Sequence, residues 1–241
     1  TTIYNYTVTT SGTCAAQTEV GDITIVPIAS LDVTSVSSTL NQTICDGDNI
    51  TPITFDFGGS ATNASGIGLP LGVTLGPIVG NTITISGPAN VNVVTPTTYT
   101  FTVTATGNGI CEEESFTGRI VVLPNDTLTH LSGDKNPTTC NGNDPANPGM
   151  TPIVYQLGGG ATSGIVTGLP NGVSFTYSAT TRQLTIDGTP SLAIAVPTPF
   201  NYTVTTIGSC ASQTDSGIIT VNPLSTISLS SAVSTTSQIG A

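Results

Sequence analysis

The sequence is poor in charge. Only 7% of its 241 residues are Asp, Glu, Lys or Arg, whereas an average globular protein has roughly 25%. Three residues are basic (Arg119, Lys135 and Arg182) and 14 are acidic, so the formal net charge is −11. Nucleic acids and anionic bilayers are bound mainly through Lys and Arg. The composition therefore predicts no nucleic acid partner and no attachment to an anionic membrane surface.

Several features of enzymes and membrane proteins are also missing. The chain has no Trp and one histidine, His130, which excludes a histidine cluster for zinc. No GxSxG motif or comparable context supports a Ser-His-Asp triad. No run of about 18 apolar residues could form a membrane-spanning helix, and no signal peptide opens the chain. The sequence predicts no enzyme, no cofactor and no membrane insertion.

The residues that are abundant favour strands and turns. Thr and Val suit a pleated, half-buried backbone, while Gly, Pro and Asn suit turns. Apolar and polar residues alternate from Tyr99 to Ala105: Tyr99, Phe101 and Val103 share one face with Ala105, and threonines occupy the other. This period of two predicts strands with one face in a core. The pattern gives about seven short strands per repeat and an all-β fold.

The chain contains an internal repeat of about 98 residues. Three segments match closely, and they are YNYTVTTSGTCAAQTEVGDITIVP (4–27), YTFTVTATGNGICEEESFTGRIVVLP (99–124) and FNYTVTTIGSCASQTDSGIITVNP (200–223). A repeat of this length fits a β-sandwich domain of about 100 residues rather than a solenoid. The sequence therefore predicts tandem Ig-like β-sandwich domains in an extended array. The predicted parts are the end of one repeat (1–27), two whole repeats (28–124 and 125–223) and the first strand of another (224–241).

The repeat motifs resemble those of a known group of surface proteins. GLPLGV (68–73) and GLPNGV (168–173) are followed by TISGP (84–88) or TIDGTP (185–190), and then by a YTFTVT-type strand and paired cysteines. This order resembles the Ig-like and cadherin-like repeats of giant SprB-type adhesins of gliding Bacteroidetes, which are secreted by the type IX system. The resemblance covers essentially the whole chain. It implies an extracellular, cell-surface location and a role in attachment or gliding motility.

Five cysteines occupy equivalent places in the repeats. Cys45 and Cys140 lie near the start of their repeats, whereas Cys14, Cys111 and Cys210 follow the long penultimate strand. The simplest pairing is Cys45–Cys111 and Cys140–Cys210, with the partner of Cys14 upstream of residue 1. This pairing explains the odd count and implies an oxidising compartment.

Two other cysteine arrangements remain open. One pairs Cys14 with Cys45 and Cys111 with Cys140, and the other leaves all five thiols free. In a plain seven-stranded sandwich the two cysteines of one repeat would lie near opposite poles, so the simplest pairing needs a shortened or rearranged first strand, or a different number of strands.

The sequence also offers candidate sites for a metal ion and for glycosylation. Asp46, Asp48 and Asp144 lie in equivalent Asx/Gly turns and are candidate Ca²⁺ ligands, although such turns need no metal to form. Thr127 is a candidate glycosylation site, because it lies in an Asp-Thr-Leu sequence that resembles the short O-glycosylation motif of Bacteroidetes.

These features favour the stalk of a surface adhesin, whose partners are neighbouring repeats of the same chain and, beyond them, surface polysaccharide or other cell-surface proteins. The alternatives are a carbohydrate-binding module array of a secreted protein and a self-assembling surface filament subunit. The absence of Trp argues against the first alternative, because such modules stack sugars on exposed aromatic rings.

Overall fold

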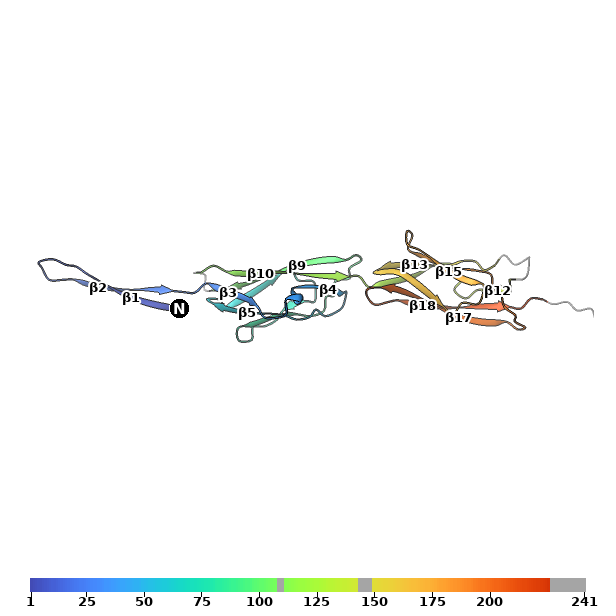
Figure 1. Cartoon of the computed structure of the whole chain (residues 1–241), viewed down its shortest axis with the longest axis horizontal. Helices are drawn as coiled ribbons and strands as arrows, with labels where there is room; N and C mark the ends of the chain where they lie inside the picture. The colour runs from blue at the N-terminus through green and yellow to red at the C-terminus, as the bar shows by residue number, and fades with distance from the viewer. Residues whose placement is uncertain (108–110, 143–148, 226–241) are drawn as a thin grey trace, which may run out of the picture. The chain divides into compact units, whose positions relative to one another are not determined.

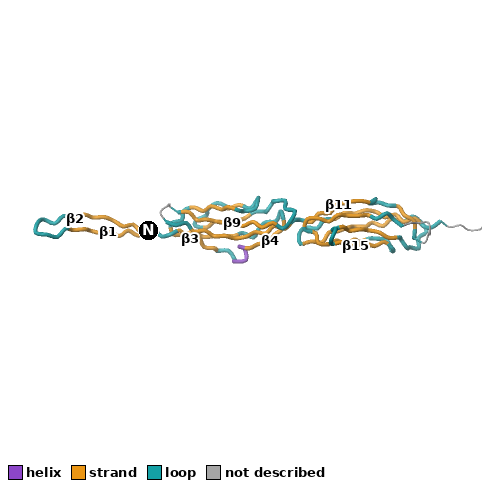
Figure 2. Tube along the Cα trace, turned by 90° about the horizontal axis from the view of Figure 1, so that it is seen from above, coloured by secondary structure: helices purple, strands orange, loops and turns teal. Residues whose placement is uncertain are grey.

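The computed structural model describes residues 1–107, 111–142 and 149–225. Strands make up nearly all of its regular structure, and the single helix among these residues is a short 3-10 turn, η1 (Ser37–Leu40). Figure 2 shows the strands in orange and η1 in purple. The prediction of an all-β fold is confirmed. The chain divides into two compact units, Thr1–Asn125 with Ser209–Ala211, and Asp126–Gly208 with the described residues from Ser212 onward.

The first unit contains a sandwich of two four-stranded sheets (Figure 1). One sheet has the order β3-β5-β8-β7, formed by Ala29–Val33, Ile53–Gly59, Thr82–Ser86 and Thr74–Leu75. The other has the order β4-β10-β9-β6, formed by Asn41–Cys45, Glu114–Leu123, Thr97–Thr106 and Asn63–Ile67. Strands β4 and β10 run parallel, and the other neighbours are antiparallel. The inner faces form one core, which includes Phe55, Ile85, Phe101 and Ile120.

The second unit has the same topology. One sheet has the order β11-β13-β16-β15, formed by Asp126–Ser132, Ile153–Gly159, Gln183–Gly188 and Val173–Ser178. The other has the order β12-β18-β17-β14, formed by Thr138–Cys140, Thr214–Asn222, Thr198–Gly208 and Ala161–Thr167. Again one pair, β12 with β18, is parallel. Tyr155, Leu184, Tyr202 and Ile219 are fully buried in its core.

The predicted alternation along the long strands is confirmed. Phe101, Val103 and Ala105 are buried in β9, while the threonines between them are more exposed.

The expected strand count is too low, because the sandwich has eight named strands where the pattern gave about seven. The first strand is divided. Strand β3 lies in one sheet, and β4 crosses to the other sheet after η1.

The first 25 residues form a separate hairpin of β1 (Thr2–Thr9) and β2 (Thr18–Ile25). Its sequence matches that of β9–β10, but neither of its edges pairs with another described strand. Four of its apolar side chains that correspond to buried positions in β9 and β10 are therefore about half exposed, and they are Tyr6 (49%), Val8 (59%), Ile23 (57%) and Ile25 (54%). An isolated two-stranded hairpin is only marginally stable in water.

A glycine lies opposite an aromatic ring in each copy of the long hairpin. Gly21 is paired with Tyr6, Gly118 with Phe101 and Gly217 with Tyr202. A Cβ on Gly118 would overlap the Phe101 ring and lie 2.9 Å from the carbonyl oxygen of Leu40. The ring therefore occupies the space that a side chain at 118 would need.

We expect Gly118→Val to lower the free energy of unfolding of the first unit by about 1–3 kcal/mol, because the fully buried Phe101 has no free space into which its ring can move. Gly21→Val is the matched control. The Tyr6 ring that it meets is half exposed and can rotate into solvent, so its effect stays within about 0.5 kcal/mol. Urea denaturation of both variants measures the difference, and equal losses would contradict this account of the glycine.

We also expect the amides of β1 and β2 to exchange with solvent far faster than those of β9 and β10. The hairpin opens without unfolding a core, whereas the paired amides of β9 and β10 open only with the sandwich. Hydrogen exchange followed by mass spectrometry measures both sets in one sample. Equal protection of the two hairpins would show that something covers β1 and β2.

Candidate functional site

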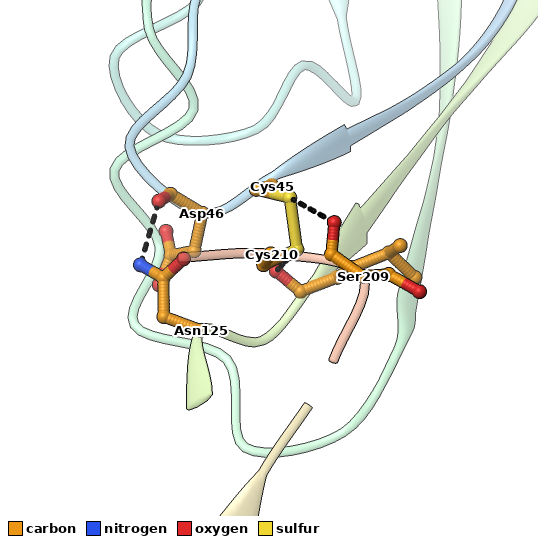
Figure 3. The surroundings of a disulfide bond; sticks show 6 residues. Cys45, Asp46, Asn125, Ser209 and Cys210 are labelled. Atoms are coloured by element: carbon orange, nitrogen blue, oxygen red, sulfur yellow. Dashed lines mark hydrogen bonds between the residues drawn. A yellow bond between two sulfur atoms is a disulfide. The ribbon is translucent and has the colours of Figure 1, made fainter. Parts of the chain in front are cut away.

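The most distinctive chemical feature of the chain is a disulfide between Cys45 and Cys210 (Figure 3). Cys45 is the last residue of β4, and the parallel register places it opposite Leu123 at the end of β10. Cys210 lies in the turn between β17 and β18, in the segment Ser209–Ala211 that belongs to the first unit. The Cα atoms are 5.6 Å apart, within the usual range for a bridged pair. The bond joins cysteines of two different sequence repeats.

The predicted pairs Cys45–Cys111 and Cys140–Cys210 are wrong in this structure. Cys45 lies opposite the last residue of β10, whereas Cys111 precedes the first. The ten residues of β10 separate these positions, a distance of roughly 30 Å at about 3.3 Å per residue. Parallel pairing of β12 with β18 likewise places Cys140 opposite Asn222, at the far end of β18 from Cys210. Bridged Cα atoms must lie within about 7 Å.

The alternative pairing is not observed either. Cys45 is bonded to Cys210 and is therefore unavailable to Cys14. The Cys14 side chain is exposed and that of Cys111 is half-buried, and neither forms a disulfide within the described residues. The reading in which all five thiols are free is also wrong, because one bond is present. Bonding between repeats was among the possibilities that the sequence left open, but with different partners.

Backbone carbonyl oxygens lie near both sulfurs of the disulfide. The Cys45 sulfur lies 3.7 Å from the carbonyl oxygen of Ser209, and the Cys210 sulfur lies 4.0 Å from that of Leu123. The side-chain amide of Asn125 donates a hydrogen bond of 2.9 Å to the carbonyl oxygen of Asp46, as Figure 3 shows. The end of β4, the end of β10 and the turn that carries Cys210 therefore meet at one place in the first unit.

The carboxylate of Asp46 organises a loop. Its two oxygens accept hydrogen bonds from the backbone amides of Val91 (2.9 Å) and Val93 (3.2 Å). Asn141 has the same place in the second unit, where its side-chain oxygen accepts a hydrogen bond from the amide of Leu192 (3.0 Å). Both side chains therefore hold the segment that leads into the next long strand, β9 or β17.

This geometry bears on the candidate Ca²⁺ ligands. Asp46 uses both carboxylate oxygens on backbone amides, and Asp48 is exposed in the turn after β4. Asp144 lies outside the described residues. Over residues 1–107, 111–142 and 149–225, no group of three or more His, Cys, Asp or Glu side chains is arranged to hold a metal ion. The Asx-turn interpretation therefore accounts for Asp46 and for its equivalent Asn141.

Strand β11 carries two other residues that the sequence singled out. Thr127, the candidate glycosylation site, is exposed on this edge strand. His130 packs its ring edge-on against Tyr155 at 5.4 Å between centroids. The neighbouring Asp126 was not singled out from the sequence. It is buried, and its carboxylate oxygens have no hydrogen-bond partner among the described residues.

The second unit also contains an ion pair next to two buried tyrosines. The Lys135 ammonium donates to a carboxylate oxygen of Asp215 at 2.6 Å. The hydroxyl of Tyr202 donates to the carbonyl oxygen of Lys135 (3.1 Å) and lies 3.3 Å from that of Tyr155. Burial is the main reason why the pKa of each tyrosine is raised. Burial alone would raise the pKa of Asp215, but hydrogen bonds from Lys135 and from the Ser216 amide outweigh it, so that pKa is lowered.

No described helix is long or apolar enough to cross a membrane.

The lowered pKa of Asp215 gives a pH-dependent contribution to stability. A carboxyl whose pKa is lower in the folded than in the unfolded chain stabilises the fold above its unfolded value, here 3.8, and loses that contribution as the pH falls through its folded value. We therefore expect Asp215→Asn to be less stable than the wild type at pH 7, by up to about 1 kcal/mol for a partly exposed pair. The difference should vanish near pH 2. Urea denaturation at both pH values measures it, and a difference that grows in acid would contradict the assignment.

Comparison with known proteins identifies the fold. No protein-family model and no curated protein matches the sequence. Among solved structures, Drosophila N-cadherin EC1-4 is similar with a TM-score of 0.51 and 11% identity, over 81% of this chain and 49% of that chain. The protocadherin GammaB4 extracellular domain matches with a TM-score of 0.46 and 9% identity, over 92% of this chain and 38% of that chain. This chain thus spans half or less of the length of either protein. The likeness to N-cadherin shows the fold alone, that of cadherin-like β-sandwich domains in tandem.

Proposed function

We propose that this chain is part of the repeat region of a bacterial cell-surface adhesin, where its sandwiches form a stalk that carries an adhesive part away from the cell. Three observations support the proposal. The same eight-stranded topology occurs twice in one chain, the fold is shared with the cadherin repeats of the N-cadherin structure, and a disulfide is present, which is typical of exported proteins. The finer assignment, to SprB-type proteins of gliding Bacteroidetes, rests on the sequence motifs.

The Cys45–Cys210 bond is the observation that carries this proposal. The chain already passes from one repeat to the next at Pro124 and Asn125. The disulfide adds a second covalent connection between residues 165 positions apart. Closing so long a loop stabilises the folded chain by on the order of 5 kcal/mol in the chain-entropy model. A stalk must transmit force between the cell and the surface to which it attaches. The peptide link and the disulfide both suit this role, because neither depends on noncovalent contacts, and the loop closure also stabilises the fold.

The repeat boundaries belong to the same proposal. Residues 1–27 would be the end of one repeat, 28–124 and 125–223 two whole repeats, and 224–241 the beginning of another. The hairpin β1–β2 supports this division, because its face equivalent to the core of the first sandwich is uncovered. In a complete repeat, strands equivalent to β4 and β6 would pair with its two edges. The partners of the chain would then be, first of all, its own neighbouring repeats.

Carbohydrate binding is less well supported. Sugars are bound by stacking on exposed aromatic rings, and none of the Tyr and Phe side chains of the two sandwiches is exposed. Tyr4 and Tyr6 are exposed, but they lie in the β1–β2 hairpin, where the proposed repeat structure would cover Tyr6. The proposal therefore assigns these sandwiches a structural role and leaves contact with polysaccharide or other surface proteins to other parts of the adhesin.

Force spectroscopy tests the mechanical role. When the chain is pulled from its ends, the oxidised protein should not extend between residues 45 and 210. Removing the bond in a Cys45→Ser/Cys210→Ser variant should add about 550–600 Å of unfolded length, at roughly 3.5 Å for each of the 165 residues spanned. Cys14→Ser is the matched control and should behave as the wild type. Equal lengths with and without the Cys45–Cys210 pair would contradict the mechanical role.

The adhesin assignment has a separate test. Antibodies to a peptide from β11 should detect, in extracts of the source cell surface, a polypeptide of several hundred kilodaltons. A species near 24 kDa, the mass of the present chain, would contradict the stalk and would favour a self-assembling filament subunit.

A further inference from the structure

Cys111 occupies the same structural position as Cys210, although it has no disulfide partner among the described residues. The three turn cysteines lie 13 residues before the closing proline of their repeats (14 and 27, 111 and 124, 210 and 223). Each belongs to the turn between the two strands of the long hairpin. Cys111 is therefore placed to form the same kind of disulfide in its own repeat as Cys210 forms in the next one.

The surroundings of the two sulfurs also match. The Cys111 thiol donates a hydrogen bond of 3.5 Å to the carbonyl oxygen of Val26, the residue before Pro27. The Cys210 sulfur lies 4.0 Å from the carbonyl oxygen of Leu123, the residue before Pro124. Val26 and Leu123 are thus equivalent, and each turn cysteine lies beside the last residues of the preceding repeat.

The register of the parallel strands then indicates where a partner for Cys111 would be. Leu123 is paired with Cys45, and this pairing brings Cys45 within bonding distance of Cys210. In a complete preceding repeat, the strand equivalent to β4 would pair with β2 in the same register and place its last residue opposite Val26. A cysteine there would lie beside Cys111.

We propose that successive repeats are joined by a ladder of disulfides, in which Cys111 bonds the preceding repeat's equivalent of Cys45. This rests on the proposed function, because it requires a complete repeat before residue 28. Cys14 would bond one repeat further back in the same way. Each bond joins cysteines about 165 residues apart, as Cys45 and Cys210 are.

The chemistry of each rung is thiol–disulfide exchange. Two thiols lose two protons and two electrons, one S–S bond forms, and an acceptor disulfide is reduced to two thiols. Oxidised glutathione supplies that acceptor in vitro.

An extended chain tests the ladder. Residues 1–124 followed by residues 28–241 place a second copy of the first repeat directly after the first. Cys111→Ser in the first copy leaves one Cys111 in the molecule. After refolding with reduced and oxidised glutathione, blocking with N-ethylmaleimide and peptic digestion, mass spectrometry should find both Cys45–Cys111 and Cys45–Cys210 peptides. Cys111 should be at least ten times less alkylated than in the 241-residue chain.

A matched variant locates the partner. Adding Cys45→Ser in the first copy should abolish the Cys45–Cys111 peptide, expose Cys111 to alkylation and leave Cys45–Cys210 in place. If Cys111 remains alkylated in the extended chain, or if its bond survives this substitution, the ladder is wrong. Such a result would not contradict the proposed stalk, because the force measurement depends only on the Cys45–Cys210 bond. A force measurement that contradicts the stalk would likewise leave the mapped disulfides unchanged.

Discussion

The parallel pairing of the short strand β4 with β10 is the constraint on which the other features of the first unit depend. It places β4 in the sheet opposite to that of β3 and brings Cys45 to the end of β10, beside Leu123. Antiparallel pairing of the same two strands would reverse β4 and carry Cys45 toward the other end. The second unit repeats the arrangement with β12 and β18, which places Cys140 opposite Asn222. The direction of one five-residue strand thus decides which cysteines can meet.

The fold was largely predictable from the sequence, because its signals are local. Alternation from Tyr99 to Ala105 identifies a strand with one buried face, and the buried Phe101 and Val103 confirm it. The eighth strand was missed, since nothing in the run from Ala29 to Cys45 indicates that it changes sheets after η1. The glycines opposite Tyr6, Phe101 and Tyr202 recur at equivalent positions of the repeats, but only the cross-strand register shows that each faces an aromatic ring.

The cysteine pairing could not be predicted, because it depends on the end of the strand at which each residue lies. Equivalent positions in the repeats showed that the cysteines form two classes, and the structure joins one member of each class. The sequence could not show whether the two come from one repeat or from neighbours. Within one repeat, the length of β10 separates Cys45 at its end from Cys111 before its start. The candidate calcium ligand Asp46 illustrates a similar limit, since its carboxylate is occupied by the amides of Val91 and Val93.

The separation of Cys45 and Cys210 has a consequence for biosynthesis. A chain is made from its N-terminus, at about 5–20 residues per second, so Cys45 exists for about 10–30 s before Cys210 is added 165 residues later. The first sandwich has all its strands once β10 ends at Leu123 and needs no residue of β17 or β18 to build its core. It can therefore fold while Cys45 is still a thiol. The bond to Cys210 can form only after β17, which ends at Gly208, has been synthesised.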